Sequence, residues 1–263
     1  MARRETFELF GEAADLYHLR RPRYPRALFN RLVEVAGLGD GDAVLEVGTG
    51  TGIATQELIR RGLLVTGLEP SPEMAAVAQV GLGPTGGLRV VTSSFEDWVP
   101  DLVGFAAVIS AQAWHWVDPE VRYRKAAGVL ARDGWLALIW NRATGGDAEV
   151  RAGLDGIYSR LAPELAGLPP GELDLDRREE IAASGLFQQP RLECFGFEVR
   201  YGARAYAELM ATQSDHRRLP ASRRRQLLAA IEEEIDSAGG SYRVVWESRL
   251  YLARCLGSPQ AFP

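Results

Sequence analysis

The sequence predicts an α/β fold in which a doubly wound parallel sheet is covered by helices on both faces. Three observations lead to this prediction. Short apolar segments alternate with helical segments at the spacing of βαβ units. The apolar segments, such as 105–110, are continuously hydrophobic, which is typical of strands buried on both faces of a parallel sheet. Parallel crossovers are right-handed, so helices should lie on both sides of the sheet.

Composition limits the possible classes of protein. The 263 residues are enough for one large domain or for a domain with a cap, and 46% hydrophobic with 25% charged residues is typical of a folded chain. The net charge of −5 gives no electrostatic reason to expect nucleic-acid binding. No signal peptide or membrane-length apolar run is seen, so we expect a cytoplasmic protein without membrane contact. Cys194 and Cys255 are expected to be reduced, half-buried packing residues, and no metal-ligand cluster is expected.

The first half of the chain carries the regular alternation. We expect strands at 43–47, 63–68, 88–92, 105–110 and 135–140. Helices are expected at 13–17, 26–36, 54–61, from Pro72 onward, and from 118 to 130. Ser71 is a good N-cap for the helix that begins at Pro72.

The pattern changes after Asn141. We expect a loop at 142–146, helices at 149–165, 177–184, 205–212 and 221–237, and a strand at 191–200. A last strand is expected from 242 to about 246, and its continuation to 256 fits either a strand or a helix. The segment 167–171 reads as a proline-glycine break. These patterns predict an N-terminal helical lid segment (1–36), a ligand-binding core (37–141), a helical cap insertion (142–190) and a C-terminal completion of the sheet with helices on the substrate side (191–263).

A glycine-rich turn follows the strand expected at 43–47. Gly48, Gly50 and Gly52 occupy every second position, and glycine allows a ligand or another backbone to approach closely. A dinucleotide loop would have its third glycine at the position of Ile53. Glu46, just before the turn, would repel a pyrophosphate but attract an ammonium group. The turn therefore predicts a nucleoside that carries an amino-acid tail.

Three further segments should reach the same edge of the sheet, because each follows a parallel strand. Glu69 ends the second strand, 17 residues after Gly52, at a spacing suited to a carboxylate that accepts the ribose hydroxyls. The segment 94–96 follows the third strand and 110–116 follows the fourth.

These motifs resemble the class I S-adenosylmethionine-dependent methyltransferases. The matching segments are Leu45-Glu46-Val47-Gly48-Thr49-Gly50-Thr51-Gly52, 65–74 and 129–136. Segments 93–98 and 110–118 look more narrowly like the small-molecule branch that includes the trans-aconitate-type enzymes and the type 11 methyltransferase domains. The resemblance implies a Rossmann-like sheet of seven strands, mostly parallel with an antiparallel last strand, and S-adenosyl-L-methionine as cofactor.

The resemblance also implies roles for individual residues. Glu46 and the Gly48 and Gly50 backbone would hold the methionine end, Glu69 the ribose, Phe95 and Glu96 the adenine, and the 110–111 backbone the ammonium group. The full implied cofactor set is Glu46, Gly48, Thr49, Gly50, Gly52, Glu69, Pro70, Met74, Ser94, Phe95, Glu96, Ser110 and Ala111. The chain departs from the family pattern at Ser94 and Ala106, where many members have acidic residues. The departure at Ser94 weakens or reroutes the expected contact with the adenine amino group.

The residues that face the methyl acceptor are less defined. His115 is the candidate catalytic base or a substrate ligand, and its alternative is packing between two tryptophans. Trp114 and Trp116 are candidates for the substrate pocket or for the core. Tyr17 and Arg21, with Arg20, are candidates for a lid or for a solvated basic face. His216 is a substrate candidate, or part of a connection between helices.

Three functions compete. The first is methyl transfer by in-line displacement to a small molecule at O, N, C or a carboxylate, by a monomer or homodimer. The second is methylation of a nucleic acid or protein, although Ser110-Ala111-Gln112-Ala113 lacks the Asn/Asp-Pro-Pro-Tyr/Phe turn that amino-methylating DNA enzymes usually share. The third is cofactor binding with lost or repurposed transfer.

Overall fold

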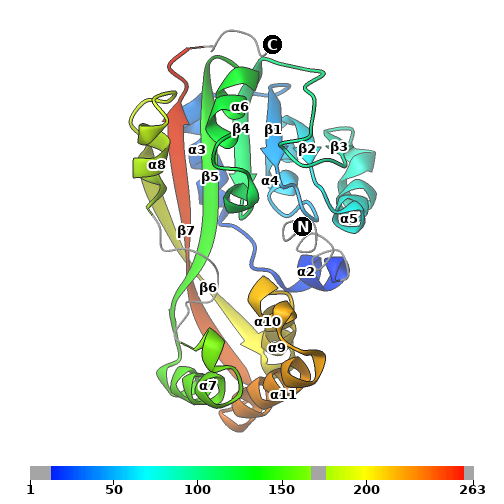
Figure 1. Ribbon diagram of the computed structural model, residues 1–263, viewed down its shortest axis with the longest axis vertical. Helices are drawn as coiled ribbons and strands as arrows, with labels where there is room; N and C mark the ends of the chain where they lie inside the picture. Colours follow the sequence, from blue (N-terminus) through cyan, green and yellow to red (C-terminus); the bar gives the residue numbers. More distant parts are fainter. Residues whose placement is uncertain (1–12, 167–175, 258–263) are drawn as a thin grey trace. The chain divides into compact units, whose positions relative to one another are not determined.

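The computed structural model describes residues 13–166 and 176–257, and its sheet has seven strands in the order β3-β2-β1-β4-β5-β7-β6 (Figure 1). The strands are β1 (Ala43–Val47), β2 (Leu64–Leu68), β3 (Leu88–Val91), β4 (Phe105–Ala111), β5 (Leu130–Gly146), β6 (Arg191–Gly202) and β7 (Ser241–Arg254). The pairs β1–β2, β1–β4, β2–β3 and β4–β5 are parallel, with Val44 beside Val65 and Leu45 beside Val108. The last strands are antiparallel, so the predicted mostly parallel, seven-stranded α/β fold is confirmed.

Contacts divide the described chain into two compact units. Unit 2 holds 23–140, 176–195 and 248–257, and unit 1 holds 13–22, 141–166 and 196–247. The strands β5, β6 and β7 contribute residues to both units. The segment 142–190, expected to form one cap, is thus shared between the units, and its role toward an acceptor stays a prediction.

Unit 2 contains the sheet β1–β5 and helices on both of its faces. Alternate strand residues face opposite sides: Leu45 and Val108 pack in one apolar cluster, and Val44 and Ile109 pack in the other. The helices of this unit are α3 (Arg26–Ala36), α4 (Thr55–Ile59), α5 (Pro72–Leu82), α6 (Arg122–Val129) and α8 (Arg177–Ala183), with the 3-10 helices η1 (Gly83–Thr85) and η2 (Trp114–Trp116). α6 and α8 cover the face of the first cluster, and α3, α4 and α5 cover the other face (Figure 1).

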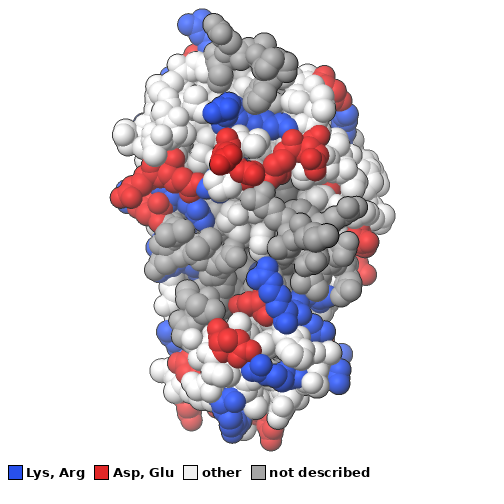
Figure 2. Space-filling model, viewed as in Figure 1, with Lys and Arg blue, Asp and Glu red and all other residues white. Residues whose placement is uncertain are grey.

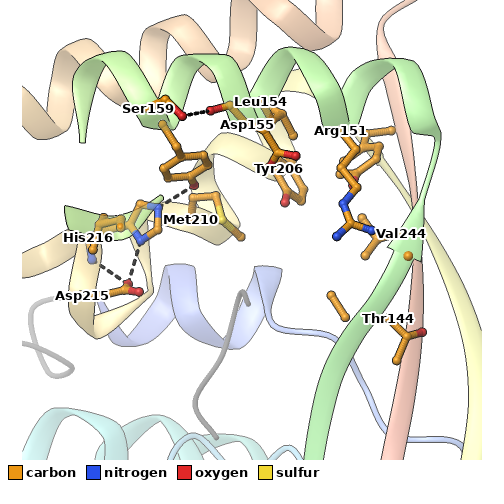
Figure 3. A pocket seen from close by; sticks show the side chains of 15 residues that line it. Thr144, Arg151, Leu154, Asp155, Ser159, Tyr206, Met210, Asp215, His216 and Val244 are labelled. Carbon is orange, nitrogen blue, oxygen red and sulfur yellow. Dashed lines mark hydrogen bonds and ion pairs between the residues drawn. The ribbon is translucent and has the colours of Figure 1, made fainter. Parts of the chain in front are cut away.

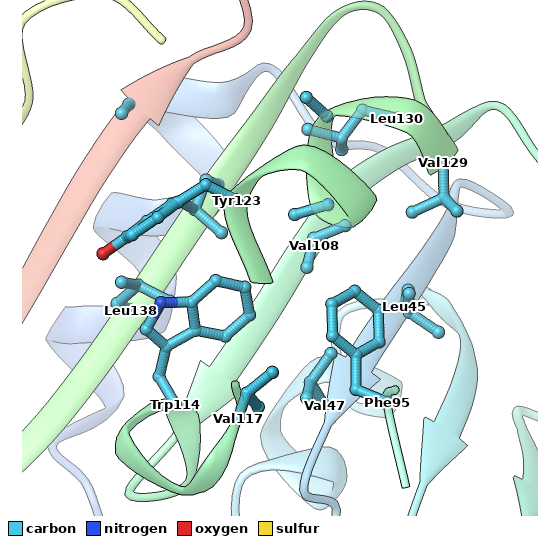
Figure 4. Packing of buried hydrophobic residues seen from close by; sticks show 14 of the residues in the cluster. Leu45, Val47, Phe95, Val108, Trp114, Val117, Tyr123, Val129, Leu130 and Leu138 are labelled. Atoms are coloured by element: carbon cyan, nitrogen blue, oxygen red, sulfur yellow. The ribbon is translucent and has the colours of Figure 1, made fainter. Parts of the chain in front are cut away.

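The cluster under α6 is rich in aromatic side chains. Trp114, Phe95 and Tyr123 lie over Leu45, Val108 and the other strand residues (Figure 4). The Trp114 ring is 6.0 Å from Phe95 and 5.6 Å from Tyr123, between ring centres. Trp114 is fully buried, so the packing alternative left open by the sequence accounts for its position.

Unit 1 is mainly helical. Its helices are α2 (Ala14–Arg20), α7 (Ala148–Leu161), η3 (Pro163–Leu165), α9 (Ala203–Ala211), α10 (Ser214–Arg218) and α11 (Ala221–Ser237). Leu227, Ile231 and Ile235 of α11 are fully buried, as the helical period predicts, whereas Leu228 is only partly buried. The core of unit 1 also takes residues from α7, α9 and the start of β7.

Two predicted elements were wrong. The segment 142–146, expected to be a loop because of Gly145-Gly146, is the end of β5. A Cβ at Gly146 would lie 2.7 Å from the carbonyl oxygen of Arg243, so this glycine allows the backbones to approach closely. The helix expected from residue 118 begins only at Arg122, because residues 114–116 form η2 and the Asp118 carboxylate accepts the Glu120 amide instead of capping the helix.

The structure also bears on what composition predicted about the cysteines, membrane spans, metal ligands and surface charge. Both cysteines are free, but the expectation that they are half-buried was wrong, because Cys255 is buried and Cys194 is exposed. Across 13–166 and 176–257 no helix has both the length and the apolar character needed to cross a membrane. The described residues also contain no group of three or more potential metal ligands. Basic and acidic side chains are interspersed on the face shown in Figure 2. The predicted break at 167–171 lies outside the described residues.

Candidate functional site

The glycine turn follows β1 in unit 2, and its backbone is fixed by the neighbouring strand. The amides of Gly48 and Thr49 both donate to the Leu68 carbonyl, at 2.9 and 3.0 Å. Gly48, Gly50 and Gly52 have φ angles of +76°, +58° and +85°, in the region that favours glycine. A Cβ at Gly48 would lie 2.1 Å from the Cβ of Ala113, in the segment after β4. The spacing of the glycines therefore serves both the turn and its packing.

Glu69, just beyond β2, is tied directly to this turn. Its carboxylate accepts the Gly50 amide at 2.8 Å and the Ser71 amide at 2.9 Å. The side chain of Ser71 accepts the Met74 amide, which confirms it as the N-cap of α5. Burial raises the pKa of Glu69 to about 7, although the two amide hydrogen bonds oppose the shift. A carboxylate has four acceptor positions, so two remain for a ribose diol.

Glu46 is the second buried carboxylate, with 1% of its surface exposed. It accepts a 2.6 Å hydrogen bond from the Thr55 hydroxyl in the first turn of α4. Burial raises the pKa of Glu46 to about 8, the Thr55 hydrogen bond opposes the shift, and the charge of Glu69 adds to it. Two nearby carboxylates of this kind favour a cationic ligand, because a positive charge lowers the pKa of each.

The segment after β4 forms the other side of the turn. Ser110 is fully buried and donates its hydroxyl to the Val47 carbonyl at 2.8 Å. Gln112 has a φ angle of +59°, which is uncommon for a residue with a side chain and is often found at functional sites. Sequence reasoning included Gln112 only as part of the segment 110–116, and it missed Thr55, which belongs to no linear motif of its own.

The segment predicted to flank the adenine is held by side-chain contacts within unit 2. Phe95 is 3% exposed and lies in the aromatic cluster. Glu96 accepts the Asp118 amide at 2.7 Å, and its carbonyl accepts the Lys125 ammonium at 3.0 Å. Ser94 donates to Asp97 at 2.8 Å. Their roles toward adenine stay predictions.

His115 lies between two tryptophans. Its ring is 4.8 Å from the ring of Trp116, and Trp140 Nε1, at 3.5 Å, donates to His115 Nδ1. A neutral imidazole that accepts at Nδ1 carries its proton on Nε2. In this tautomer Nε2 is a hydrogen-bond donor, and the unprotonated nitrogen, Nδ1, already accepts the hydrogen of Trp140. The guanidinium of Arg177 lies 5.1 Å from the Trp140 ring centre, on its face.

The other predicted substrate residues lie in unit 1. Arg21 donates to the Thr212 carbonyl at 2.9 Å and lies over the ring of Tyr17, at 4.6 Å. Arg20 pairs with Glu208 of α9 at 2.6 Å. His216, on α10, is 5% exposed and lines a cavity described below. The structure thus groups Tyr17, Arg21 and His216 in one unit, and His115, Trp114 and Trp116 in the other.

The residues of the glycine turn fit the cofactor that the sequence implies. The three glycines leave the backbone of the turn without side chains, and the Thr49 hydroxyl is buried without a hydrogen-bond partner among the described residues. Glu46 and Glu69 supply acceptors for an ammonium group and for hydroxyls. In a doubly wound sheet, ligands bind at the carboxyl ends of the parallel strands, where this turn lies.

Comparison with known proteins supports this assignment. Residues 45–138 match the family model of a methyltransferase domain. An uncharacterized methyltransferase of Mycobacterium tuberculosis is 38% identical over 140 residues, which cover 53% of this chain and 55% of the relative. A probable S-adenosylmethionine-dependent methyltransferase of Saccharomyces cerevisiae is 29% identical over 128 residues, or 46% of this chain and 43% of the relative. The alignments thus span about half the length of these relatives.

Solved structures show the same fold. A protein of Anaeromyxobacter dehalogenans assigned as a type II methyltransferase has a TM-score of 0.62 at 23% identity, and the match covers 89% of this chain and 97% of that one. A phosphoethanolamine N-methyltransferase of Haemonchus contortus, with S-adenosylhomocysteine bound, has a TM-score of 0.54 at 15% identity, covering 95% of this chain and 58% of that one. Residues 45–138 of this chain are thus similar to a methyltransferase domain, and the fold around them is that of known methyltransferases.

Proposed function

We propose that this chain transfers a methyl group from S-adenosyl-L-methionine to a small-molecule acceptor. The observation that carries the proposal is the pair of buried carboxylates, Glu46 and Glu69, on either side of the glycine turn. Both have raised pKa values without a bound cation, so a ligand with an ammonium group relieves an unfavourable arrangement. The cofactor would supply a methyl group that is electrophilic because it is attached to a sulfonium.

The protein's part in such a reaction is mainly to position the two reactants. Glu69 would hold the ribose and Glu46 the amino-acid end, so that the acceptor atom lies in line with the methyl group. His115, with its proton on Nε2, would donate a hydrogen bond to the acceptor and orient it. An acceptor that reacts without losing a proton needs no base.

A small acceptor is favoured over a nucleic acid by charge. The chain has a net charge of −5, and the two signs are interspersed on the face in Figure 2. A nucleic-acid substrate would instead favour a basic surface. The segment 110–113 also lacks the proline-containing turn expected of enzymes that methylate amino groups in DNA.

Two measurements test this proposal. Calorimetry should show that S-adenosylhomocysteine binds and that Glu69→Ala weakens binding by about 1–3 kcal/mol, the cost of losing hydrogen bonds to a charged group. Incubation of a cell extract with methyl-labelled S-adenosylmethionine should then place the label in the small-molecule filtrate. Label in protein or nucleic acid would overturn the acceptor class, binding without transfer would favour a repurposed protein, and absence of binding would overturn the whole proposal.

A further inference from the structure

Unit 1 contains a cavity of about 440 Å³ that the methyl-transfer proposal does not use. It lies among α7, α9, α10 and the unit 1 ends of β5 and β7 (Figure 3). Its size is that of a site for a small organic molecule. The lining mixes apolar and polar side chains, and its apolar members Leu154, Met210 and Val244 are well buried, with 4%, 1% and 2% exposed.

One side of the cavity carries a chain of hydrogen bonds. The Asp215 carboxylate is 2.7 Å from His216 Nδ1, and the Tyr158 hydroxyl is 2.7 Å from His216 Nε2. Dashed lines in Figure 3 mark the contacts of His216, among them the one with Asp215. Burial alone would raise the pKa of Asp215, but the hydrogen bonds with His216 hold it below its usual value.

The ionised carboxylate of Asp215 sets the direction of each hydrogen bond in this series. An ionised Asp215 only accepts, so His216 Nδ1 carries the proton and Nε2 of the neutral ring is the acceptor. Tyr158 must then donate its hydroxyl hydrogen to Nε2. The remaining lone pair on the Tyr158 oxygen therefore offers an acceptor to a ligand that carries a hydrogen-bond donor.

Tyr206 offers a ligand a hydrogen-bond donor, whereas Tyr158 offers an acceptor. Its side chain is 5% exposed and packs edge-on against Tyr242, with ring centres 5.0 Å apart. Its hydroxyl, in a residue that lines the cavity, has no hydrogen-bond partner among the residues that the structure describes. A hydroxyl without a protein partner is available to donate, so a ligand acceptor at this position would be stabilising. Burial and neighbouring tyrosines raise the pKa of Tyr206, which keeps it a donor at neutral pH.

The charges around the cavity favour a neutral occupant. Asp215 already has His216 as its partner, and Arg151 and Asp155 are exposed and opposite in sign. A buried ligand charge would therefore lack a dedicated counter-charge. We propose that this cavity binds a small neutral molecule with an apolar or aromatic body and one hydroxyl group, which donates to Tyr158 and accepts from Tyr206.

The methionines provide a test that separates this cavity from the cofactor site. The chain has three, Met1, Met74 and Met210. Met210 lines the cavity, and the Cε of Met74 would be 3.5 Å from a Cβ at Gly50 in the glycine turn. In protein labelled with carbon-13 at the methionine methyls, 2-naphthol should shift the Met210 signal and S-adenosylhomocysteine the Met74 signal. Met210→Leu and Met74→Leu assign the two signals.

The hydroxyl requirement is tested with a matched probe. Replacing the hydroxyl hydrogen by methyl, in 2-methoxynaphthalene, removes the donor and should weaken binding roughly three- to tenfold, the value of one net hydrogen bond. Tyr158→Phe should abolish this preference, while Tyr206→Phe should weaken both probes. Tyr201→Phe is the control, because Tyr201 packs on Tyr206 with ring centres 5.8 Å apart but does not line the cavity.

The outcomes separate the two proposals. The cavity site is overturned if 2-naphthol does not shift the Met210 signal, even if S-adenosylhomocysteine shifts the Met74 signal. It is also overturned if the Tyr158→Phe variant still binds 2-naphthol more tightly than 2-methoxynaphthalene. If S-adenosylhomocysteine does not shift the Met74 signal, the result counts against the cofactor proposal alone. If 2-naphthol binds, labelled S-adenosylmethionine distinguishes the source of the natural ligand: formation of 2-methoxynaphthalene indicates a methyl acceptor, and binding without methylation indicates a regulatory ligand.

Discussion

The Thr55 hydroxyl donates a 2.6 Å hydrogen bond to the carboxylate of Glu46, which is 1% exposed. Glu46 lies near the end of the central strand β1, and Thr55 is the first residue of α4. The contact therefore joins the two elements that the glycine turn connects. One hydroxyl is a weak substitute for water around a carboxylate, and the pKa of Glu46 is accordingly raised to about 8. Burial of Glu46 beside the glycine turn therefore positions the carboxylate for a ligand and lowers the stability of the ligand-free protein.

Glu46→Gln should stabilise the ligand-free protein at alkaline pH. The folded protein keeps a proton on Glu46 up to about pH 8, whereas the unfolded chain loses it near the usual value of 4.5. The folded state thus binds more protons between these values, and the stability of the wild type falls as pH rises through this window. Urea unfolding at pH 5 and pH 9 should show a difference between variant and wild type only at the higher pH.

The same variant should bind S-adenosylhomocysteine more weakly, because a neutral amide does not attract an ammonium group. Thr55→Val is the matched control, since it removes the hydrogen bond and keeps the charge. A Glu46→Gln variant that is no more stable than wild type at pH 9 would contradict the buried-carboxylate argument.

Cofactor binding should release protons and should tighten with pH. Glu46 and Glu69, with pKa values of about 8 and about 7, are largely protonated at pH 6 and must ionise to accept the ligand. Affinity for S-adenosylhomocysteine should fall by up to about tenfold per pH unit and per group below these values. Calorimetry in buffers of different ionisation enthalpy measures the protons released, and Glu46→Gln should reduce their number. Affinity that is constant from pH 6 to pH 9 would show that these carboxylates do not contact the ligand.

Gly48→Ala should destabilise the protein more than Gly41→Ala. Both glycines have positive φ angles, +76° and +84°, so both variants carry similar backbone strain. Only at Gly48 would the new Cβ collide with another atom, the Cβ of Ala113, 2.1 Å away; at Gly41 nothing lies within 4 Å. Thermal unfolding should place Gly48→Ala below Gly41→Ala by roughly 1–3 kcal/mol, the usual cost of overpacking. Equal losses of stability in the two variants would mean that the segment after β4, which contains Ala113, moves away from the new Cβ at no energetic cost.

Sequence patterns predicted the parts of this molecule that depend on local chemistry. The helix Ala221–Ser237 was predicted with its observed bounds because its apolar residues repeat with the helical period. The strand end at 142–146 was missed because a pair of glycines indicates a turn unless the partner strand is known. The contact between Tyr158 and His216 joins positions 58 residues apart, so no local pattern could reveal the cavity that they line.

His115→Gln should retain more methyl-transfer activity than His115→Ala. Trp140 donates to His115 Nδ1, which places the imidazole proton on Nε2 and makes this nitrogen a donor. The glutamine amide nitrogen can reproduce a donor near the Nε2 position, but glutamine cannot accept a proton at neutral pH. If His115 orients the acceptor, the alanine variant should lose rate and the glutamine variant should recover part of it, with little change in S-adenosylhomocysteine affinity in either. If His115 is instead a general base, both variants should be equally slow and the wild-type rate should follow the ionisation of a histidine. Transfer of label to the small-molecule filtrate, measured from pH 5.5 to pH 9, decides between the two roles.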